Sequence, residues 1–502
     1  MPMTTPLPTR IDSAAHTREI DAALIAGGVP GSELMQRAAE ALWERVRAHW
    51  PDRHELTVLC GGGNNGGDGY LVARLAHQAG WDVNLFAVAP PSGLGGDAAA
   101  AHQAAEAAGV RIRPWISDAV LRGVVVDALL GTGIVDQVRD PYAAVIGAVN
   151  ASGLPVVAVD LPSGLHADTG VVLGDAIRAD LTVTFITLKI GLLTGQGPDH
   201  AGELHFAALA ELPPDVPEPI ARRLCLAEWS DTLGTRPRSA HKGMFGHALV
   251  VGGDLGMGGA VVLAAETALR SGTGRVSAAT RSAHIAPLLT RCPEVMVHAA
   301  DEPQAIDALL GSASVLIVGP GLGKGEWGQG IMDRILRSDL PKVLDADALN
   351  IIAERFADGI ALGENCIITP HPAEAGRLLG CSTAQVQADR LQALRSLVHR
   401  YRCAVILKGV GSLVGGGAPA GMPVGLSTAG NPGMATAGMG DVLSGLCGAM
   451  LAQQVPAGMA ARYATLIHGL AGDRAAEQGE RGMLATDLMM SIRRLLNTQD
   501  MP

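Results

Sequence analysis

Short apolar runs that end in glycine-rich loops recur along almost the whole chain, and they restrict its fold more than any other feature. The runs lie at residues 56–60, 124–126, 155–159, 248–251, 315–318 and 404–407. Each is followed by a turn and usually by a stretch rich in Ala and Leu, which favours a helix. Continuous β-branched runs that alternate with helices are typical of parallel sheets covered on both faces. We therefore expect an α/β protein.

The chain is long enough for more than one domain. It has 502 residues, whereas a domain typically has about 150. Residues 211–241 are rich in Pro and Arg, and such proline density disfavours a continuing helix or a central strand. We place a boundary near residue 215, which predicts one α/β domain over residues 1–215 and a second over residues 216–502.

Composition excludes several classes of protein. The 38 Lys and Arg against 49 Asp and Glu, and the 3% aromatic content, disfavour a basic or base-stacking nucleic-acid binder. No run reaches the ~18 apolar residues of a membrane span, and residues 1–12 lack the apolar core of a signal peptide. Seven isolated cysteines without a Cys-x-x-Cys pair suit a reducing compartment. We expect a cytoplasmic protein without nucleic-acid or membrane partners.

The first glycine loop, GGGNNGGDG at residues 61–69, follows an apolar run and precedes the helical stretch YLVARLAHQAG. Free N–H groups at a helix N-terminus attract anions. The loop lacks the Lys-Ser/Thr of a P-loop and does not match the dinucleotide fingerprint. Its distinctive part is Asn-Asn-Gly-Gly-Asp, which places amide and carboxylate oxygens beside backbone donors.

Two further carboxylate loops follow apolar runs in the same half of the chain. Asp127 ends one run, and Asp160 and Ser163 follow the next. Ligands of open α/β sheets bind at the carboxyl ends of the strands, so we expect these residues to converge with Asn65. Each aspartate alone could equally cap a turn, but three such loops in one domain favour a shared site.

GGGNNGGDGYLVARLA, VDALLGTG and VDLPSGLHADTG resemble the NAD(P)H-hydrate epimerase domain, a family with a Rossmann-like three-layer fold that interconverts the R and S epimers of hydrated NAD(P)H. The resemblance implies a potassium ion held by Asn65, Asp127 and Ser163, since oxygen donors suit a hard cation. Asp160 is the candidate acid/base. Lys189 is either a second polar group of the site or an exposed strand-end lysine. The implied hydrate-binding residues are Asn64, Asn65, Gly66, Gly67, Asp68, Gly131, Thr132, Gly133, Ile134, Val135, Asp136, Gln137 and Asp160.

The second half carries glycine loops of a different kind. GNPGMATAGMGDVLSG places Gly440 and Asp441 where a helix should open. Pooled N–H groups beside a carboxylate are what phosphoryl transfer to a hydroxyl needs, because they stabilise charge and accept the nucleophile's proton. Together with the upstream LKGVGS at residues 407–412, this segment resembles the ribokinase-like superfamily.

These motifs, with HKG, LVVGG, VGPGLG, DADALN and TPHPAE, resemble the ADP/ATP-dependent NAD(P)H-hydrate dehydratase, and the two resemblances cover nearly the whole chain. Asp441 would be the base for attack on the terminal phosphoryl group of ADP, the co-substrate, with Mg²⁺ implied by the nucleotide chemistry. Asp254 stands where the family pattern has Ser. The implied hydrate contacts are Ala260, Gly321, Gly323, His371 and Asp441, and the implied nucleotide contacts are Lys408, Gly409, Val410, Gly411, Ser412 and Gly440.

Other functions remain open at this stage. A ribokinase-like small-molecule kinase with an accessory nucleotide-binding domain would share the Gly-Met-Gly-Asp segment but leaves the Asn-Asn-Gly-Gly-Asp loop unexplained. A non-catalytic nucleotide sensor would not need Asp160 and Asp441. A nicotinamide dehydrogenase fits least, because neither glycine loop matches the dinucleotide fingerprint. The preference for ADP or ATP is also open. The apolar face of a helix around residues 34–46, together with the family, favours a homo-oligomer, a tetramer or larger.

Overall fold

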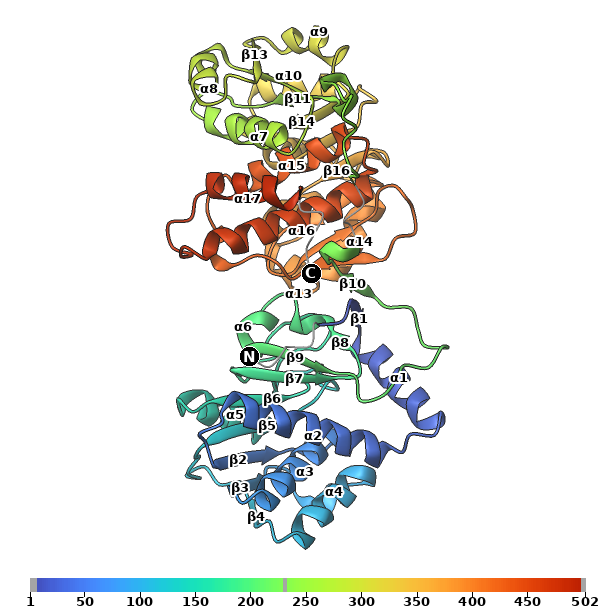
Figure 1. Cartoon of the computed structure of the whole chain (residues 1–502), viewed down its shortest axis with the longest axis vertical. Coiled ribbons are helices and arrows are strands. Elements are labelled where there is room, and N and C mark those ends of the chain that lie inside the picture. The colour runs from blue at the N-terminus through green and yellow to red at the C-terminus, as the bar shows by residue number, and fades with distance from the viewer. Residues whose placement is uncertain (1–6, 229–232, 498–502) are drawn as a thin grey trace. The chain divides into compact units, whose positions relative to one another are not determined.

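The computed structural model describes residues 7–228 and 233–497, and Figure 1 shows its course. Residues 1–6 lie outside the described residues, and they are part of the segment 1–12 in which the sequence shows no apolar core of a signal peptide. Residues 229–232 of the Pro- and Arg-rich stretch also lie outside the described residues. The chain divides into two compact units, residues 1–221 and residues 222–502. Each unit has a sheet of its own, and each is described by itself below.

The first unit is built on a seven-stranded sheet in the order β4-β3-β2-β5-β6-β7-β9. All of its neighbouring strands pair in parallel. Its strands are β2 (Glu55–Cys60), β3 (Asp82–Ala87), β4 (Ile112–Pro114), β5 (Val124–Ala128), β6 (Val156–Val159), β7 (Leu181–Phe185) and β9 (Glu203–Ala207). A short parallel pair, β1 (Arg10–Asp12) with β8 (Leu188–Lys189), lies beside α1 (Ala14–Ala26).

Helices cover this sheet on both faces, as the apolar runs predict. Alternate residues of β5 belong to different cores: Val124 and Val126 pack with α2 (Gly31–His49) and α3 (Asn64–Gln78), whereas Val125 packs with α5 (Tyr142–Ala151). The apolar residues of α2, Leu42 among them, are therefore used inside the unit. The remaining helices of this unit are α4 (Gly96–Ala107) and the short α6 (Gly197–Ala201). The result is the expected three-layer α/β/α arrangement.

Helix α3 begins earlier than the sequence predicts. The pattern places a loop over residues 61–69, but α3 already begins at Asn64, so most of the glycine loop is helical. Tertiary packing explains the difference. A Cβ on Gly69 would lie 2.5 Å from the Cβ of Ala128 and 2.9 Å from Sγ of Cys60. The glycine therefore lets the first turns of α3 press directly against β2 and β5, and this packing offsets the low helix propensity of glycine.

The sheet of the second unit runs in the order β13-β12-β11-β14-β15-β16-β17-β18-β19. Pairing is parallel from β13 to β17, and β18 and β19 add antiparallel strands. The strands are β11 (His247–Val251), β12 (Arg275–Thr280), β13 (Met296–Ala299), β14 (Val315–Val318), β15 (Lys342–Leu344), β16 (Cys366–Ile368), β17 (Ala404–Leu407), β18 (Ser412–Gly415) and β19 (Val424–Ser427). The strand β10 (Ala221–Arg223) lies at the division between the units.

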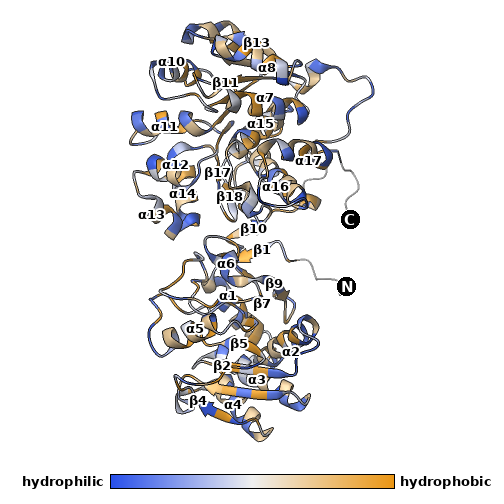
Figure 2. Cartoon of the chain, turned by 90° about the vertical axis from the view of Figure 1, so that its left-hand side faces the viewer, coloured by the Kyte–Doolittle hydropathy of each residue, from blue (hydrophilic) through white to orange (hydrophobic). Residues whose placement is uncertain are grey.

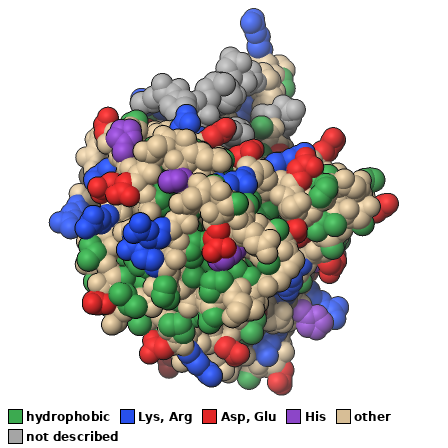
Figure 3. All heavy atoms as spheres, turned by 90° about the horizontal axis from the view of Figure 1, so that it is seen from below, with side chains coloured by type: hydrophobic (Ala, Val, Ile, Leu, Met, Phe, Trp, Pro, Cys, Tyr) green, Lys and Arg blue, Asp and Glu red, His purple; other side chains and the backbone are tan. Residues whose placement is uncertain are grey.

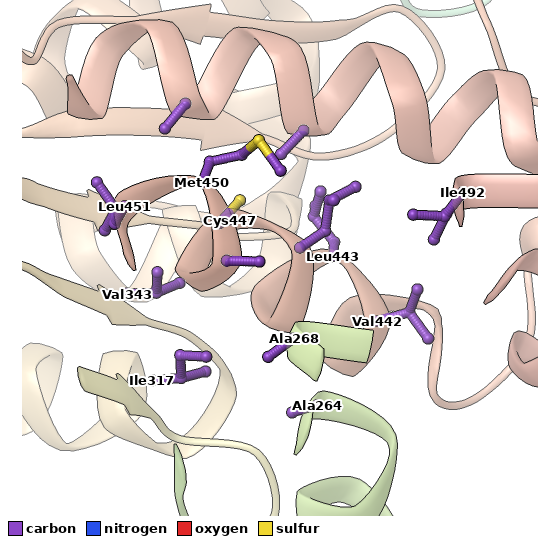
Figure 4. Packing of buried hydrophobic residues seen from close by; sticks show 14 of the residues in the cluster. Ala264, Ala268, Ile317, Val343, Val442, Leu443, Cys447, Met450, Leu451 and Ile492 are labelled. Carbon is purple, nitrogen blue, oxygen red and sulfur yellow. The ribbon is translucent and has the colours of Figure 1, made fainter. Parts of the chain in front are cut away.

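The core of this unit forms around α15 (Met439–Ala452), which is buried along almost its entire length. Figure 4 shows Val442, Leu443 and Cys447 of this helix among side chains from the strands and from neighbouring helices. Those helices include α7 (Gly258–Arg270), α16 (Ala457–Ala476) and α17 (Leu488–Leu495). Burial on all sides fixes the N-terminus of α15 against the carboxyl ends of the strands.

The other helices of this unit carry polar residues on their outward sides, as the hydropathy colouring of Figure 2 shows for α11–α13. They are α8 (Ile285–Arg291), α9 (Asp307–Leu310), α10 (Glu326–Ile335), α11 (Ala346–Arg355), α12 (Pro372–Leu379), α13 (Thr383–Ala388) and α14 (Arg390–Tyr401). Among the described residues, no helix is long and apolar enough to cross a membrane. On the face seen in Figure 3, basic and acidic side chains are scattered among apolar ones.

Candidate active sites

A cavity of about 500 Å³ lies in the first unit, at the carboxyl ends of the sheet strands. Of the residues expected to bind the hydrate, those that line it are Asn64, Asn65, Asp68, Gly131, Thr132, Gly133 and Asp160. The others lie elsewhere. Gly66 and Gly67 are buried in the first turns of α3, and residues 134–137 are not part of the lining, with Val135 70% exposed. The glycine loop after β5 therefore meets the cavity through its first half.

Asp127 lies in β5, outside the cavity lining, and accepts hydrogen bonds from neutral donors. It is fully buried, and Oδ1 accepts a hydrogen bond of 2.6 Å from Oγ of Ser163 while Oδ2 accepts one of 2.8 Å from the Ser163 amide. Burial raises the pKa of Asp127 to about 6, although the hydrogen bonds from Ser163 and Leu129 lower it. Asn65 joins the same region, since its Nδ2 donates to the Leu130 carbonyl over 3.2 Å.

Asp160 has a different environment, because a buried ammonium group holds it. Its backbone adopts a left-handed conformation with φ of 64°, which turns the residue after β6. Oδ1 accepts hydrogen bonds from Nζ of Lys189, from the Phe185 amide and from Oγ1 of Thr184. Lys189 is 0% exposed, so the alternative of an exposed strand-end lysine is wrong. The pair places a fixed carboxylate at the cavity wall.

The structure adds acidic side chains that the motifs do not contain. Asp21 of α1 and Asp97 of α4 line the same cavity as Asp68 and Asp160. Burial, reinforced by Asp160 and Asp21, raises the pKa of Asp68 well above its ordinary value. The pKa of Asp21 is raised by burial and then by Asp97 and Asp160. No local pattern marks Asp21 or Asp97, because they reach the site only through the packing of α1 and α4.

In the second unit, the predicted opening of a helix after the Gly-Met-Gly-Asp glycines is confirmed. Gly438 has φ of 90° and immediately precedes α15, which begins at Met439. Asp441 is thus the third residue of the helix. Burial, followed by the charge of Asp345, raises the pKa of Asp441 to about 7, while Lys408 lowers it. A carboxylate with this pKa can accept a proton near neutral pH.

Lys408 lies beside this helix N-terminus at the end of β17. Its Nζ is 2.9 Å from Oδ1 of Asp345 and 3.9 Å from Oε2 of Glu374. A Cβ built on Gly440 would lie 3.4 Å from that Nζ. Lys408 and Gly440 are two of the expected nucleotide contacts. The structure places them next to each other and beside the carboxylate of Asp345.

The rest of the expected nucleotide loop, residues 409–412, connects β17 to β18, which begins at Ser412. Val410 is exposed, and Oγ of Ser412 donates to the Gly409 carbonyl over 2.9 Å. The buried guanidinium of Arg390 supports the loop from behind, where its Nη2 donates to the carbonyl groups of Leu407 and Lys408. Sequence analysis missed Arg390, which lies on α14 with no motif around it.

Besides Asp441 on α15, the expected hydrate contacts of this unit come from the first turn of α7, the loop after β14 and the N-cap of α12. The amides of Gly253 and Asp254 donate to the carbonyl groups of Pro320 and Gly321, and a Cβ on Gly321 would lie 3.3 Å from the Cβ of Ala260. The Gly323 amide donates to Oδ2 of Asp347 over 2.9 Å. The first turn of α7, which carries Ala260, therefore lies against the loop that carries Gly321 and Gly323. Asp254 keeps a polar contact, since its Oδ1 accepts from Nε of Arg281 over 2.8 Å.

His371 caps α12 rather than pointing freely into solvent. Its Nδ1 accepts from the amides of Ala373 and Glu374, so the proton of the neutral ring is on Nε2. Burial and the nearby charges of Lys408 and Arg377 lower its pKa. The imidazole is therefore a neutral hydrogen-bond donor at the edge of the site.

Comparisons with known proteins find family matches in both units of the chain. The family described as YjeF-related protein N-terminus matches residues 31–191, and the family described as NAD(P)H-hydrate dehydratase matches residues 248–494. A ribokinase-like superfamily protein from Enterococcus faecalis has a TM-score of 0.50 at 25% identity, covering 58% of this chain and 100% of its own.

Two curated relatives carry the name bifunctional NAD(P)H-hydrate repair enzyme Nnr. The protein from Coxiella burnetii is 45% identical over 96% of this chain and 98% of its own length. The protein from Escherichia coli is 44% identical over 93% of this chain and 90% of its own length. With both expected families matched in the expected order, the chain belongs to the bifunctional NAD(P)H-hydrate repair enzymes.

Proposed function

We propose that this chain repairs hydrated NADH and NADPH in two reactions. Residues 1–215 epimerise the R and S hydrates, and residues 216–502 dehydrate the S hydrate at the expense of ADP. The observation that carries the second assignment is Asp441, whose pKa of about 7 accompanies a place in the first turn of a buried helix beside the ammonium group of Lys408. That combination unites a base with an anion site.

The dehydration follows from this geometry. Asp441 accepts the proton of the substrate hydroxyl, whose oxygen attacks the terminal phosphorus of ADP, and AMP leaves. The amides at the start of α15 and Nζ of Lys408 stabilise the charge of the transferred phosphoryl group. Inorganic phosphate is then eliminated together with a proton from the adjacent ring carbon, which restores the dihydronicotinamide. The water removed from the hydrate thus ends in the phosphate.

Mg²⁺ would enter with the nucleotide, because phosphate oxygens and water supply most of its ligands in such sites. It would neutralise phosphate charge during transfer. Among residues 7–228 and 233–497 no three His, Cys, Asp or Glu side chains gather closely enough to hold a metal ion. We therefore assign no protein ligand to Mg²⁺.

Potassium suits the Asp127 network in the first unit. Asp127 is a fully buried carboxylate, and the described residues that donate hydrogen bonds to it, Ser163 and Leu129, are neutral. Oxygen atoms of Asn65, Asp127 and Ser163 form a donor set of the hard type that K⁺ prefers. A bound K⁺ would supply the positive charge that this carboxylate lacks.

For the epimerase we propose that Asp160 is the acid/base for exchange at the hydroxyl-bearing carbon, with ring opening as the alternative route. The hydrate would occupy the 500 Å³ cavity that Asp160 lines with Asn64, Asn65 and Asp68. Lys189 holds the Asp160 carboxylate in place from the buried side.

The free cysteines suit the cytoplasm, and a homo-oligomer remains part of the proposal on the ground of family membership alone.

The test follows absorbance at 340 nm after the chain is mixed with R and S hydrates of NADH, Mg²⁺, K⁺ and ADP. We expect the whole mixture to return to NADH faster than the hydrates interconvert spontaneously. The Asp160→Asn variant should recover only the S fraction at the normal rate. Rapid R consumption by that variant would contradict the role of Asp160, and a stable phosphorylated product would instead support a small-molecule kinase.

A further inference from the structure

Asp345 has no part in the mechanism above, although it is the most buried carboxylate of the second site. It follows β15 directly and is 2% exposed. Its position at the start of α11 would suit a helix cap, but its side chain makes no cap hydrogen bond. The carboxylate is instead committed to groups at the phosphoryl-transfer site, which an ordinary capping role does not explain.

The two oxygens of Asp345 join two separate parts of that site. Oδ1 accepts from Nζ of Lys408 over 2.9 Å, at the end of β17. Oδ2 accepts from Oγ of Ser444 over 2.8 Å, and Ser444 is one turn after Asp441 on α15. Asp345 therefore links the lysine and the helix that carries the base.

This ion pair lies directly against the turn that should hold phosphate. A Cβ on Gly440 would lie 3.3 Å from Oδ2 of Asp345 and 3.4 Å from Nζ of Lys408. A position in the first turn of α15 is therefore in contact with both charges. The ammonium group is held where transferred phosphate would meet the helix N-terminus.

The pair also controls the charge around Asp441. After burial, the negative charge of Asp345 is the larger influence that raises the pKa of Asp441, and the positive charge of Lys408 opposes it. The pKa of Asp345 itself is lowered, despite burial, by the charge of Lys408 and by the hydrogen bonds from Lys408 and Ser444. The charges of this pair also act on the ionisable groups of Glu374, His371, His468 and Cys447, and Arg377 acts in turn on Glu374 and His371.

We propose that Asp345 is a positioning residue for phosphoryl transfer. It fixes Lys408 and, through Ser444, the start of α15 against the transferred group, and its charge makes Asp441 a stronger base. This inference rests on the proposed dehydratase function.

The test measures kcat and KM for ADP-dependent dehydration of the S hydrate between pH 5.5 and 9 in the full chain. For Asp345→Asn we expect kcat at pH 8 to fall on the order of 10- to 100-fold, with KM for the hydrate changed less than about threefold. The acid limb of the kcat profile should move at least about half a pH unit lower, because the charge that raises the pKa of Asp441 is gone. A purely structural role would lower activity without moving that limb.

Two further variants separate position from charge. Ser444→Ala keeps both charges, so kcat should fall by a few-fold, on the order of a lost hydrogen bond, while the acid limb stays in place. Asp333→Asn is the matched control, because it removes an aspartate from an exposed ion pair with Arg355 in the same unit. It should match the unchanged chain in kcat and in the pH profile.

The outcomes distinguish failure of the positioning role of Asp345 from failure of the dehydratase function. If Asp345→Asn does not fold, Asp345→Asn/Lys408→Met removes the buried pair together, which cores often tolerate, and its acid limb should still move lower by a smaller amount. An unmoved limb in whichever of these variants folds overturns the inference while leaving the dehydratase function intact. Absence of dehydration by the unchanged chain overturns both.

Discussion

The two candidate sites each place a buried carboxylate at the end of a parallel strand, but they obtain positive charge in different ways. Asp127, near the end of β5, accepts hydrogen bonds from neutral groups of Ser163 and Leu129, and burial raises its pKa to about 6. Asp345 after β15 pairs with Lys408, and its pKa is lowered although it is equally buried. Burial alone therefore does not set the charge of a strand-end aspartate. The partner decides it, and among the described residues the donors to Asp127 are all neutral.

The largest effect should show that the two sites work separately. Asp441→Asn removes the base of the second unit, so ADP-dependent dehydration should fall by on the order of 1000-fold, within the range seen for general bases. Epimerisation depends on Asp160 in the other unit and should keep its rate. Both rates are measured on the same preparation, dehydration at 340 nm and epimerisation by chromatographic separation of the R and S hydrates. Equal loss of both rates would contradict the separation of the sites.

A smaller effect should appear with pH. Because the pKa of Asp441 is raised to about 7, the base is protonated below that pH. Dehydration kcat should therefore fall toward tenfold for each pH unit below about 7 and level off above it. The Lys408 ammonium is internal, so the position of this limb should not depend on whether K⁺ or Na⁺ is present. A flat profile between pH 5.5 and 8 would remove Asp441 as the base.

The smallest effect concerns the stability of the first unit, in which the described donors to the buried Asp127 carboxylate are all neutral. The pKa of Asp127 is about 6 in the folded chain against an unfolded value of 3.8. The folded state therefore holds its proton longer, and stability falls as pH rises from about 4 to about 6, by about 3 kcal/mol in total. K⁺ should bind the ionised carboxylate and recover part of that loss above pH 6.

The measurement is thermal unfolding in K⁺ or in choline at pH 5 and at pH 8. We expect K⁺ to raise the unfolding temperature of the first unit by a few degrees at pH 8, on the order of 1 kcal/mol, and by less at pH 5. Asp127→Asn should lose the dependence on K⁺. Equal stabilisation at both pH values would argue against an ion on Asp127.

Much of the fold was predictable because its signals are local. The β-branched runs at residues 124–126 and 315–318 are strands, as predicted, and helices cover both faces of the first sheet. Gly438 begins a helix that carries Asp441, also as predicted. The predicted start of α3 was several residues too late, because the close approach of Gly69 to Ala128 is a tertiary contact that helix propensity does not describe.

The amino-acid sequence by itself determined the alternation of strands and helices, the motif residues and the family, since each depends on residues near one another in the chain. Only the tertiary structure decided which side chains meet. It brought Asp21 and Asp97 to the first cavity, buried Lys189 against Asp160, and joined Asp345 to Lys408 and Ser444 across 63 and 99 residues of sequence. Strand order and helix packing set these long-range contacts, and no local pattern encodes them.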